Sequence, residues 1–232
     1  QDGAKLSKRH GALGADSYRD LGFLPETMCN YLLRLGWSHG DDEIIRHEQA
    51  IEWFDVDAIG KSPARLDMAK LTNLNAHYIR EANNERLNSL IHLQLATKLG
   101  REITNEENKR LIQGMNGLKQ RAKTLIELAD SALFYCEIQP LDEKSKKFTT
   151  KEARALVQSV ADNLALIDDF TEATLDTAVR KIAEQLNEKL GSIAQPLRVA
   201  LTGSTVSPSV FEVMEVLGKE ETMRRLTTFV SN

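Results

Sequence analysis

Aromatic residues and prolines are scarce in this chain of 232 residues. Aromatic side chains make up 6% of the sequence and there are five prolines, whereas apolar residues make up 41%. Sheet sandwiches are usually enriched in aromatic residues, and helix interiors tolerate almost no proline. The composition therefore predicts folded cores built from helices, and the length allows one large domain or two to three small ones.

Cysteines and long apolar runs are also scarce. Cys29 and Cys136 lie far apart in apolar surroundings, so we expect two buried thiols of a reducing compartment and no disulfide framework. No apolar run approaches the ~18 residues of a membrane span, and no secretory signal pattern opens the chain. We therefore expect a cytoplasmic protein without a membrane partner.

The chain has no excess of positive charge. Its 30 lysines and arginines oppose 34 acidic residues, which gives a net charge of -4. Proteins that bind nucleic acid through bulk charge are strongly basic. Any contact with RNA must therefore depend on local clusters of basic residues.

The patterns of a metal site and of a phosphate-binding P-loop are missing. His39 and His47 lack the helical spacing of metal ligands, and Cys29 has no nearby partner. Gly11-Ala12-Leu13-Gly14 lacks the lysine and threonine spacing of a P-loop. We expect this chain to bind no metal ion by itself.

Apolar residues recur with helical spacing along most of the chain. Pro25 and Gly36 bound one predicted helix, and Thr104 with Glu107 fits a capping box at the start of another. The pattern predicts an all-α fold. Further predicted helices cover residues 46–54, 67–82, 85–99, 120–128, 151–164, 171–190 and 208–217.

The first residues form a loop with neither helical nor strand period. Asp2 to Gly11 contains three cations, a hydroxyl and two glycines. Ammonium and guanidinium groups neutralise phosphate, and glycine lets the backbone approach a ligand closely. Composition alone leaves two interpretations open: a loop that wraps a polyanion, and a solvated basic tail.

The order of residues in this loop, Lys5-Leu6-Ser7-Lys8-Arg9, resembles the KMSKS loop of class I aminoacyl-tRNA synthetases, in the form used by glutamyl-tRNA synthetases. The resemblance continues from this loop to the last helix and is least specific over residues 138–187. Blocks of the bacterial-type family recur in the same order at Gly22-Phe23-Leu24-Pro25-Glu26, Asn30-Tyr31-Leu32, Leu35-Gly36-Trp37-Ser38, Leu74-Asn75-Ala76-His77-Tyr78-Ile79-Arg80 and Gln195-Pro196-Leu197-Arg198.

The resemblance implies an ATP-binding loop made of Lys5, Leu6, Ser7, Lys8 and Arg9. In the family this loop closes over ATP, and Lys8 matches the catalytic lysine that steadies the pyrophosphate. A cation aimed at the charge that builds on a leaving group lowers the barrier. ATP and Mg²⁺ are thus implied for the full-length enzyme.

Three parts are implied by the same resemblance. Residues 1–83 would hold the end of the catalytic region and a stem-contact domain. Residues 84–142 and 143–232 would form two helical anticodon-binding domains, with the inner boundary in a charged connection.

Arg121 and Arg198 match the family's arginines that meet the anticodon loop, and Ser207 and Val210 are lesser candidate contacts. Without the resemblance, both arginines would be helix-face cations that pair with Glu127 or with solvent. Arginine suits RNA recognition because its planar guanidinium can stack on an unpaired base and bond its edge.

The implied function is that of the C-terminal part of an enzyme that joins glutamate to tRNA-Glu through glutamyl-adenylate. We expect the chain alone to bind tRNA as a monomer and to catalyse nothing. Because it begins at Gln1 directly before the loop, we expect it to belong to a larger protein. The alternative is a free-standing helical RNA-binding or interaction module with a vestigial loop, and whether tRNA-Gln is also charged stays open.

Overall fold

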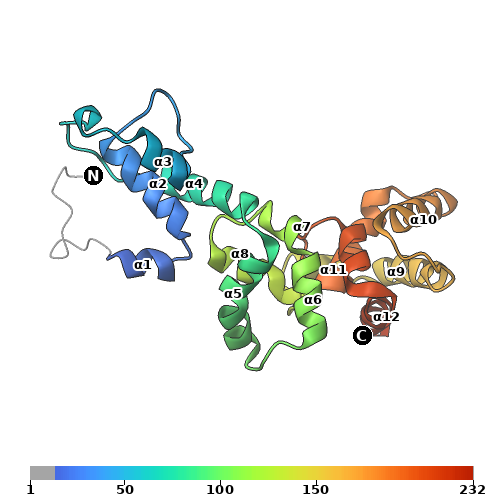
Figure 1. The fold of residues 1–232 in the computed structure, drawn as a ribbon. Helices are drawn as coiled ribbons and strands as arrows, with labels where there is room; N and C mark the ends of the chain where they lie inside the picture. Colours follow the sequence, from blue (N-terminus) through green and yellow to red (C-terminus); the bar gives the residue numbers. More distant parts are fainter. Residues whose placement is uncertain (1–13, 232) are drawn as a thin grey trace. The chain divides into compact units, whose positions relative to one another are not determined.

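The computed structural model describes residues 14–231, and this part of the chain is helical (Figure 1). Between these limits there is no β-strand, and one isolated antiparallel bridge pairs Trp37 with Ile59. The prediction of an all-α fold is therefore confirmed. No helix in the described range is both long and apolar enough to cross a membrane.

The helices follow one another along the chain with short connections. The first half contains α1 (Ala15–Asp20), α2 (Pro25–Gly36), α3 (His47–Trp53), the 3₁₀ turn η2 (Val56–Ala58), α4 (Met68–Glu81), α5 (Asn84–Leu99), α6 (Asn105–Gln113) and α7 (Met115–Lys119). The second half contains α8 (Leu125–Ala132), η3 (Leu133–Tyr135), η4 (Ser145–Phe148), α9 (Lys151–Leu164), α10 (Glu172–Gln185), α11 (Leu190–Thr202) and α12 (Val210–Ser231).

Local capping chemistry sets several of these ends as predicted. Helix α2 begins at Pro25, whose missing N–H costs nothing at a first helical position. The Asp67 carboxylate accepts hydrogen bonds from the first free backbone N–H groups of α4. At α6, Thr104 and Glu107 form the predicted capping box.

Two helix starts differ from prediction. Helix α8 begins at Leu125 and not near residue 120. Helix α12 begins at Val210, and the Ser209 carbonyl accepts its first helical hydrogen bond from Val213 N at 2.9 Å. The predicted end of this helix at residue 217 is confirmed, because Gly218 has a non-helical backbone (φ 77°) that divides α12 into two pieces.

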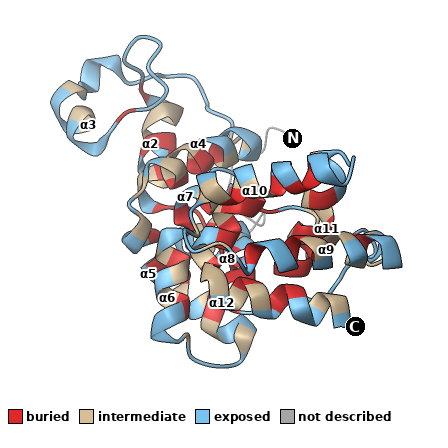
Figure 2. Cartoon of the chain, turned by 90° about the vertical axis from the view of Figure 1, so that its right-hand side faces the viewer, coloured by how far each residue is buried: buried red, intermediate tan, exposed pale blue. Residues whose placement is uncertain are grey.

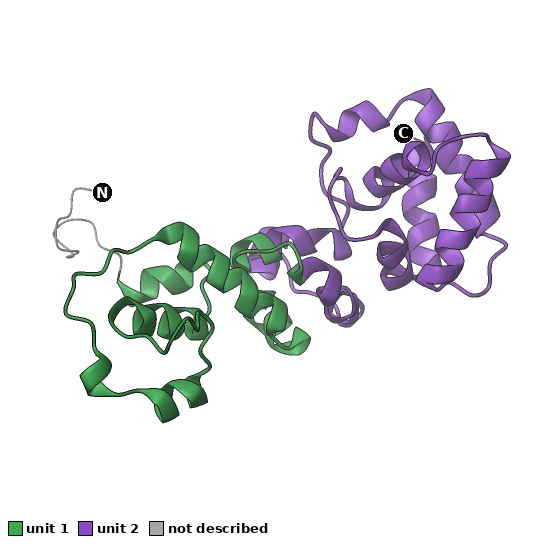
Figure 3. Ribbon diagram, turned by 90° about the horizontal axis from the view of Figure 1, so that it is seen from above, with its two compact units in different colours: residues 1–91, 119–128 green, residues 92–118, 129–232 purple. Residues whose placement is uncertain are grey.

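The chain divides into two compact units (Figure 3). Unit 1 comprises residues 1–91 and 119–128, and unit 2 comprises residues 92–118 and 129–232. The three predicted domain ranges remain a prediction. In unit 1, Phe23, which lies two residues before α2, and Tyr31 in the middle of α2 pack with Leu71 of α4. Partly buried Tyr18, Met28, Leu35, Leu66 and Leu74 surround them.

Unit 2 has its core where α9, α10, α11 and α12 meet. Buried residues line the faces that these helices turn toward one another (Figure 2). The fully buried members include Val157, Val160, Leu164, Leu175, Val179, Ile193, Leu197, Leu201, Val213 and Met214. Burial of apolar side chains such as these is the main favourable contribution to folding of the unit.

The two cysteines have different surroundings. Both are free thiols, as predicted, but only Cys136 is buried. Burial raises the pKa of the Cys136 thiol to about 12, so it stays protonated and packs as a small apolar group. The prediction that Cys29 is buried is wrong, because α2 turns Thr27, Asn30 and Tyr31 inward and leaves Cys29 exposed.

Candidate nucleic-acid interface

The predicted ATP-binding loop lies outside the described residues. Lys5, Leu6, Ser7, Lys8 and Arg9 all precede residue 14, where the description begins. The assignment of Lys8 as a catalytic residue therefore stays a prediction.

Arg121 lies in the turn between α7 and α8 and is exposed to solvent. The expectation that it lies on a helix is wrong, since α8 begins four residues later. Within residues 14–231 its guanidinium forms no hydrogen bond or ion pair, so the pairing with Glu127 that we considered is not formed. Arg121 therefore has its full set of donors available to a ligand.

The turn that carries Arg121 has a physical cause. The Thr124 hydroxyl accepts a hydrogen bond from Glu127 N at 3.2 Å, and the Glu127 carboxylate accepts one from Lys123 N at 2.8 Å. These bonds satisfy backbone donors that would otherwise be free at the start of α8. Thr124 and Glu127 therefore cap the start of α8, and Arg121 falls before this helix.

Arg198 lies on α11 and is partly buried. Its Nη1 donates a hydrogen bond to the Ser207 carbonyl at 3.0 Å, and it also donates to the Ser207 hydroxyl and the Pro208 carbonyl. The guanidinium thus holds the segment that enters α12. The structure brings Arg198 and Ser207 into direct contact.

Ser207 and Val210 are both buried, with exposed fractions of 5% and 3%. The Ser207 hydroxyl is occupied by Arg198 and Pro208, and Val210 begins α12 inside the core of unit 2. Their side chains support the backbone that follows Gly203. Arg198, Ser207 and Val210 belong to unit 2, and Arg121 belongs to unit 1.

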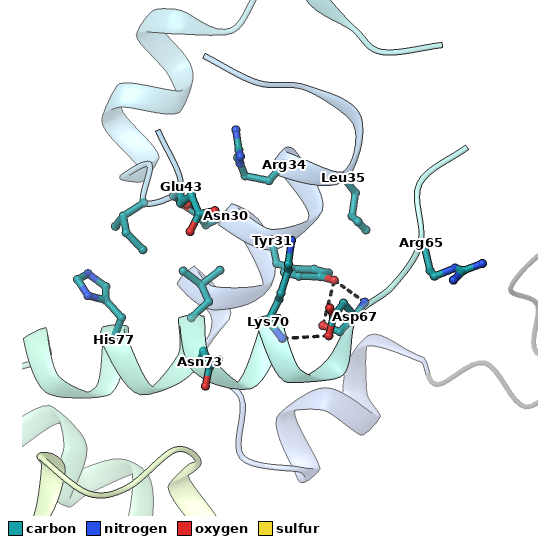
Figure 4. Close-up of a pocket in the computed structure, with 12 residues that line it drawn as sticks. Asn30, Tyr31, Arg34, Leu35, Glu43, Arg65, Asp67, Lys70, Asn73 and His77 are labelled. Atoms are coloured by element: carbon teal, nitrogen blue, oxygen red, sulfur yellow. Dashed lines mark hydrogen bonds between the residues drawn. The ribbon is translucent and has the colours of Figure 1, made fainter. Parts of the chain in front are cut away.

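Sequence reasoning missed a pocket of about 550 Å³ in unit 1 (Figure 4). Cationic side chains from α2, from the segment before α4 and from α4 itself surround it: Arg34, Arg65 and Lys70. None of the three is in an ion pair with another described residue. His77 lies on α4 further along the same wall.

Three cations and two carboxylates, Glu43 and Asp67, line this pocket, and the Asp67 carboxylate is directed at the backbone of α4. Asp67 Oδ1 accepts hydrogen bonds from Ala69 N and Lys70 N at 2.9 and 3.1 Å, at the start of α4. The Tyr31 hydroxyl accepts from Asp67 N at 2.6 Å and donates to the Asp67 carbonyl at 3.1 Å. Glu43 is the only other acidic group in the wall. The pocket therefore favours an anion such as a backbone phosphate.

This pocket could not have been found from spacing along the sequence. Arg34 and Lys70 lie far apart in the chain and meet because α2 packs against α4. The one local signal was the basic segment Lys61-Ser62-Pro63-Ala64-Arg65 that precedes α4. No group of histidine, cysteine or carboxylate residues in the described range could hold a metal ion.

Comparison with known families divides the chain into two matched regions. Residues 69–230 match the model of an anticodon binding domain. Residues 1–73 match the model of the catalytic domain of class I tRNA synthetases (E and Q). Arg121, Arg198, Ser207 and Val210 all fall in the first region, and the pocket residues Arg34 and Arg65 fall in the second.

Several relatives match over most of this chain. Glutamate–tRNA ligase 2 of Paramagnetospirillum magneticum is 57% identical over 228 residues, which cover 97% of this chain and 48% of that protein. The glutamate–tRNA ligase of Rhodopseudomonas palustris is 48% identical over 232 residues, with 97% and 49% covered. A crystal structure of a glutamate tRNA ligase from Elizabethkingia meningosepticum, in complex with its amino acid, superposes with a TM-score of 0.83 at 25% identity and covers 100% of this chain and 49% of that one. The chain spans about half the length of the relatives it matches.

Proposed function

The chain belongs to the family of anticodon-binding domains, and from this premise we propose that it is the tRNA-binding C-terminal part of a glutamate–tRNA ligase. The proposed whole enzyme acts in the cytoplasm as a monomer and joins glutamate to tRNA-Glu through glutamyl-adenylate. ATP with Mg²⁺ supplies the adenylate group. The match of residues 1–73 to a synthetase catalytic domain favours this function over a free-standing RNA-binding module.

The proposal depends most on the exposure of Arg121 and on its lack of described partners. Its guanidinium is exposed on a turn, inside the anticodon-family match, and makes no hydrogen bond or ion pair within residues 14–231. A planar cation with five free donors can stack on an unpaired base and bond its edge. We assign Arg121 to direct contact with the anticodon.

Arg198 has a different part in the proposed interface. Its Nη1 already binds Ser207 and Pro208, so it holds the loop between α11 and α12 in shape. In this proposal Arg198 contributes to the affinity for tRNA, either by contact with the RNA backbone or by stacking on a base. Ser207 and Val210 act with it by fixing the same loop.

The pocket of unit 1 supports a second contact, to the stem of the tRNA. Arg34, Arg65 and Lys70 present three cations that form no ion pair with another described residue, and they outnumber the two carboxylates of the same wall. Backbone phosphates are the RNA groups that such cations bind without regard to sequence. This contact positions the tRNA, whereas Arg121 reads it.

The predicted loop supplies the catalytic part of the proposal. Lys8 holds the pyrophosphate of ATP, and Lys5, Leu6, Ser7 and Arg9 complete the loop around it. The chemistry also needs the half of the enzyme that this chain does not cover. The chain alone therefore binds tRNA without activating glutamate.

Two assays on the 232-residue chain test the proposal. We expect it to bind a tRNA-Glu transcript in filter binding at low salt and to give no glutamate-dependent exchange between ATP and pyrophosphate. The full-length enzyme, assayed in parallel, should bind the transcript and also catalyse the exchange. Absence of tRNA binding in dilute buffer would contradict the proposed function.

A further inference from the structure

Asn75 of α4 is fully buried, and its side chain joins three segments that are distant in the sequence. Its Oδ1 accepts hydrogen bonds from Leu24 N and the Thr27 hydroxyl, both at 2.8 Å. Its Nδ2 donates to the Gly22 carbonyl at 3.2 Å and to the Lys123 carbonyl at 2.7 Å. An asparagine amide offers two donors and two acceptor sites, so every one of them is used.

A second contact lies beside these bonds. Leu125 N donates to the Gly22 carbonyl at 2.9 Å. A Cβ at Gly22 would lie 2.8 Å from Leu125 N and 2.9 Å from Ile126 N, and the φ of Gly22 is +84°. The backbone before α2 therefore packs directly on the first residues of α8, and only glycine permits this approach.

Both contacts fix the segment that carries Arg121. Lys123 is held from two sides, since its carbonyl accepts from Asn75 and its N–H donates to Glu127. Arg121 is two residues away, a distance that the chain spans with at most ~7 Å. Residues 119–128 belong to unit 1 together with Asn75 and Gly22 (Figure 3).

We propose that Asn75 is a positioning residue for Arg121: its buried amide holds the Lys123 carbonyl and so fixes the turn from which Arg121 meets the anticodon. This inference rests on the proposed function. Asparagine is suited to this position because aspartate lacks the two donors, and an apolar residue would leave the Lys123 carbonyl without its hydrogen bond, whereas the Gly22 carbonyl would keep the one from Leu125 N.

A double-mutant cycle tests the inference in the 232-residue chain, with the dissociation constant for a tRNA-Glu transcript as the readout. Asn75→Ala should weaken binding in the wild-type background by between about 2-fold and about 100-fold, the range of coupling between residues that act together. In the Arg121→Ala background the same change should alter binding by less than about 2-fold. Equal effects in both backgrounds, or no effect in the wild type, would overturn the inference.

Thr27→Val is the matched control. It removes one hydrogen bond to the Asn75 side chain but leaves the hydrogen bond from Asn75 Nδ2 to the Lys123 carbonyl in place. We expect it to lower the melting temperature while the affinity for tRNA stays within about 2-fold. A loss of affinity equal to that of Asn75→Ala would show that Asn75 acts only through the stability of unit 1, and would overturn the inference.

Hydrogen exchange gives a readout that needs no RNA. In Asn75→Ala the amide of Leu125 should exchange at least about 10-fold faster, since its acceptor at Gly22 is also released. Unchanged exchange at Leu125 would overturn the inference. If Asn75→Ala does not fold, the cycle and the exchange experiment are done with Asn75→Ser, with the same expected results. Failure of the wild-type chain to bind tRNA would instead refute the proposed function, whereas failure of the cycle alone would leave that function intact.

Discussion

The guanidinium of Arg225, which has an exposed fraction of 0%, binds the carboxylate of Glu221 one helical turn earlier on α12, with Nε and Oε1 2.6 Å apart. Its Nη1 donates to the carbonyls of Phe134 and Leu201 at 2.7 and 2.6 Å. One buried cation thus ties the second piece of α12 to η3 and to the end of α11. The core of unit 2 therefore depends on a charge that must stay paired.

Glu221→Gln should destabilise the chain strongly. The change leaves Arg225 buried without its counter-charge, and removal of one partner of a buried pair costs about 3 kcal/mol or more. Urea unfolding, followed by circular dichroism, measures the effect. Glu220→Gln is the control, since Glu220 is the neighbouring residue in the chain and is exposed. Similar midpoints of urea unfolding for the two variants would contradict the role of Glu221.

Stability should fall as the pH is lowered from about 5 toward 2. Hydrogen bonds from Arg101 lower the pKa of the Glu107 carboxyl from 4.5 to about 2. Burial raises the pKa of Glu221, but hydrogen bonds from Arg224 and Arg225 outweigh it and hold that pKa at about 2. Both carboxyls bind protons more readily when unfolded, so their contribution is present above about 4.5 and is lost as the pH falls through the folded-state values.

The measurement is the midpoint of urea unfolding at pH 7, 5, 4 and 3. Glu107→Gln removes one of the two titrating groups, so its midpoint should change less between pH 5 and 3 than that of the wild type. A wild type whose midpoint is constant over this range would contradict the two lowered pKa values.

Salt should weaken the binding of tRNA, and the pocket of unit 1 should account for part of the effect. Each phosphate contact contributes about 0.9 or less to the slope of log affinity against log salt. Replacement of Arg34, Arg65 and Lys70 by alanine should reduce the slope by up to about 3. Arg180→Ala is the control because Arg180 is paired with Asp176 at 2.9 Å; an equal change of slope in this variant would argue against the pocket.

Arg198→Ala should weaken the binding of tRNA-Glu and tRNA-Gln transcripts by the same factor. Its hydrogen bonds to Ser207 and Pro208 shape a loop and make no base contact. Dissociation constants for the two transcripts, compared between wild type and variant, provide the measurement. A selective loss for one transcript would mean that Arg198 reads a base.

Helix ends with a local cause could be predicted from the sequence. Pro25, Asp67 and Thr104 each act on backbone groups within their own first turn, so neighbouring residues carry the information. The start of α8 was missed because Thr124 and Glu127 fit both a helix interior and a helix cap. Only the bonds that they form decide between the two.

Features that depend on distant partners could not be predicted. Thr27 and Asn30 are polar yet buried, because Asn75 and the segment at Glu43 satisfy their hydrogen bonds. The helical pattern of α2 contains no sign of this. The basic pocket has the same origin, since its cations meet only when α2 packs against α4. Arg121 was chosen because it matches an arginine of the family, and the structure adds that it is exposed and lies in a turn.

We propose that this chain reads an anticodon base through Arg121. The most direct measurement compares the affinity of the chain for a tRNA-Glu transcript and for the same transcript with the third anticodon base changed from cytosine to guanine. We expect guanine to weaken binding by ~1–3 kcal/mol in the wild type, the value of one good side-chain contact to a base. We also expect Arg121→Gln to remove most of this difference. Equal affinity of the wild type for both transcripts, or an equal loss for both in Arg121→Gln, would contradict the proposal.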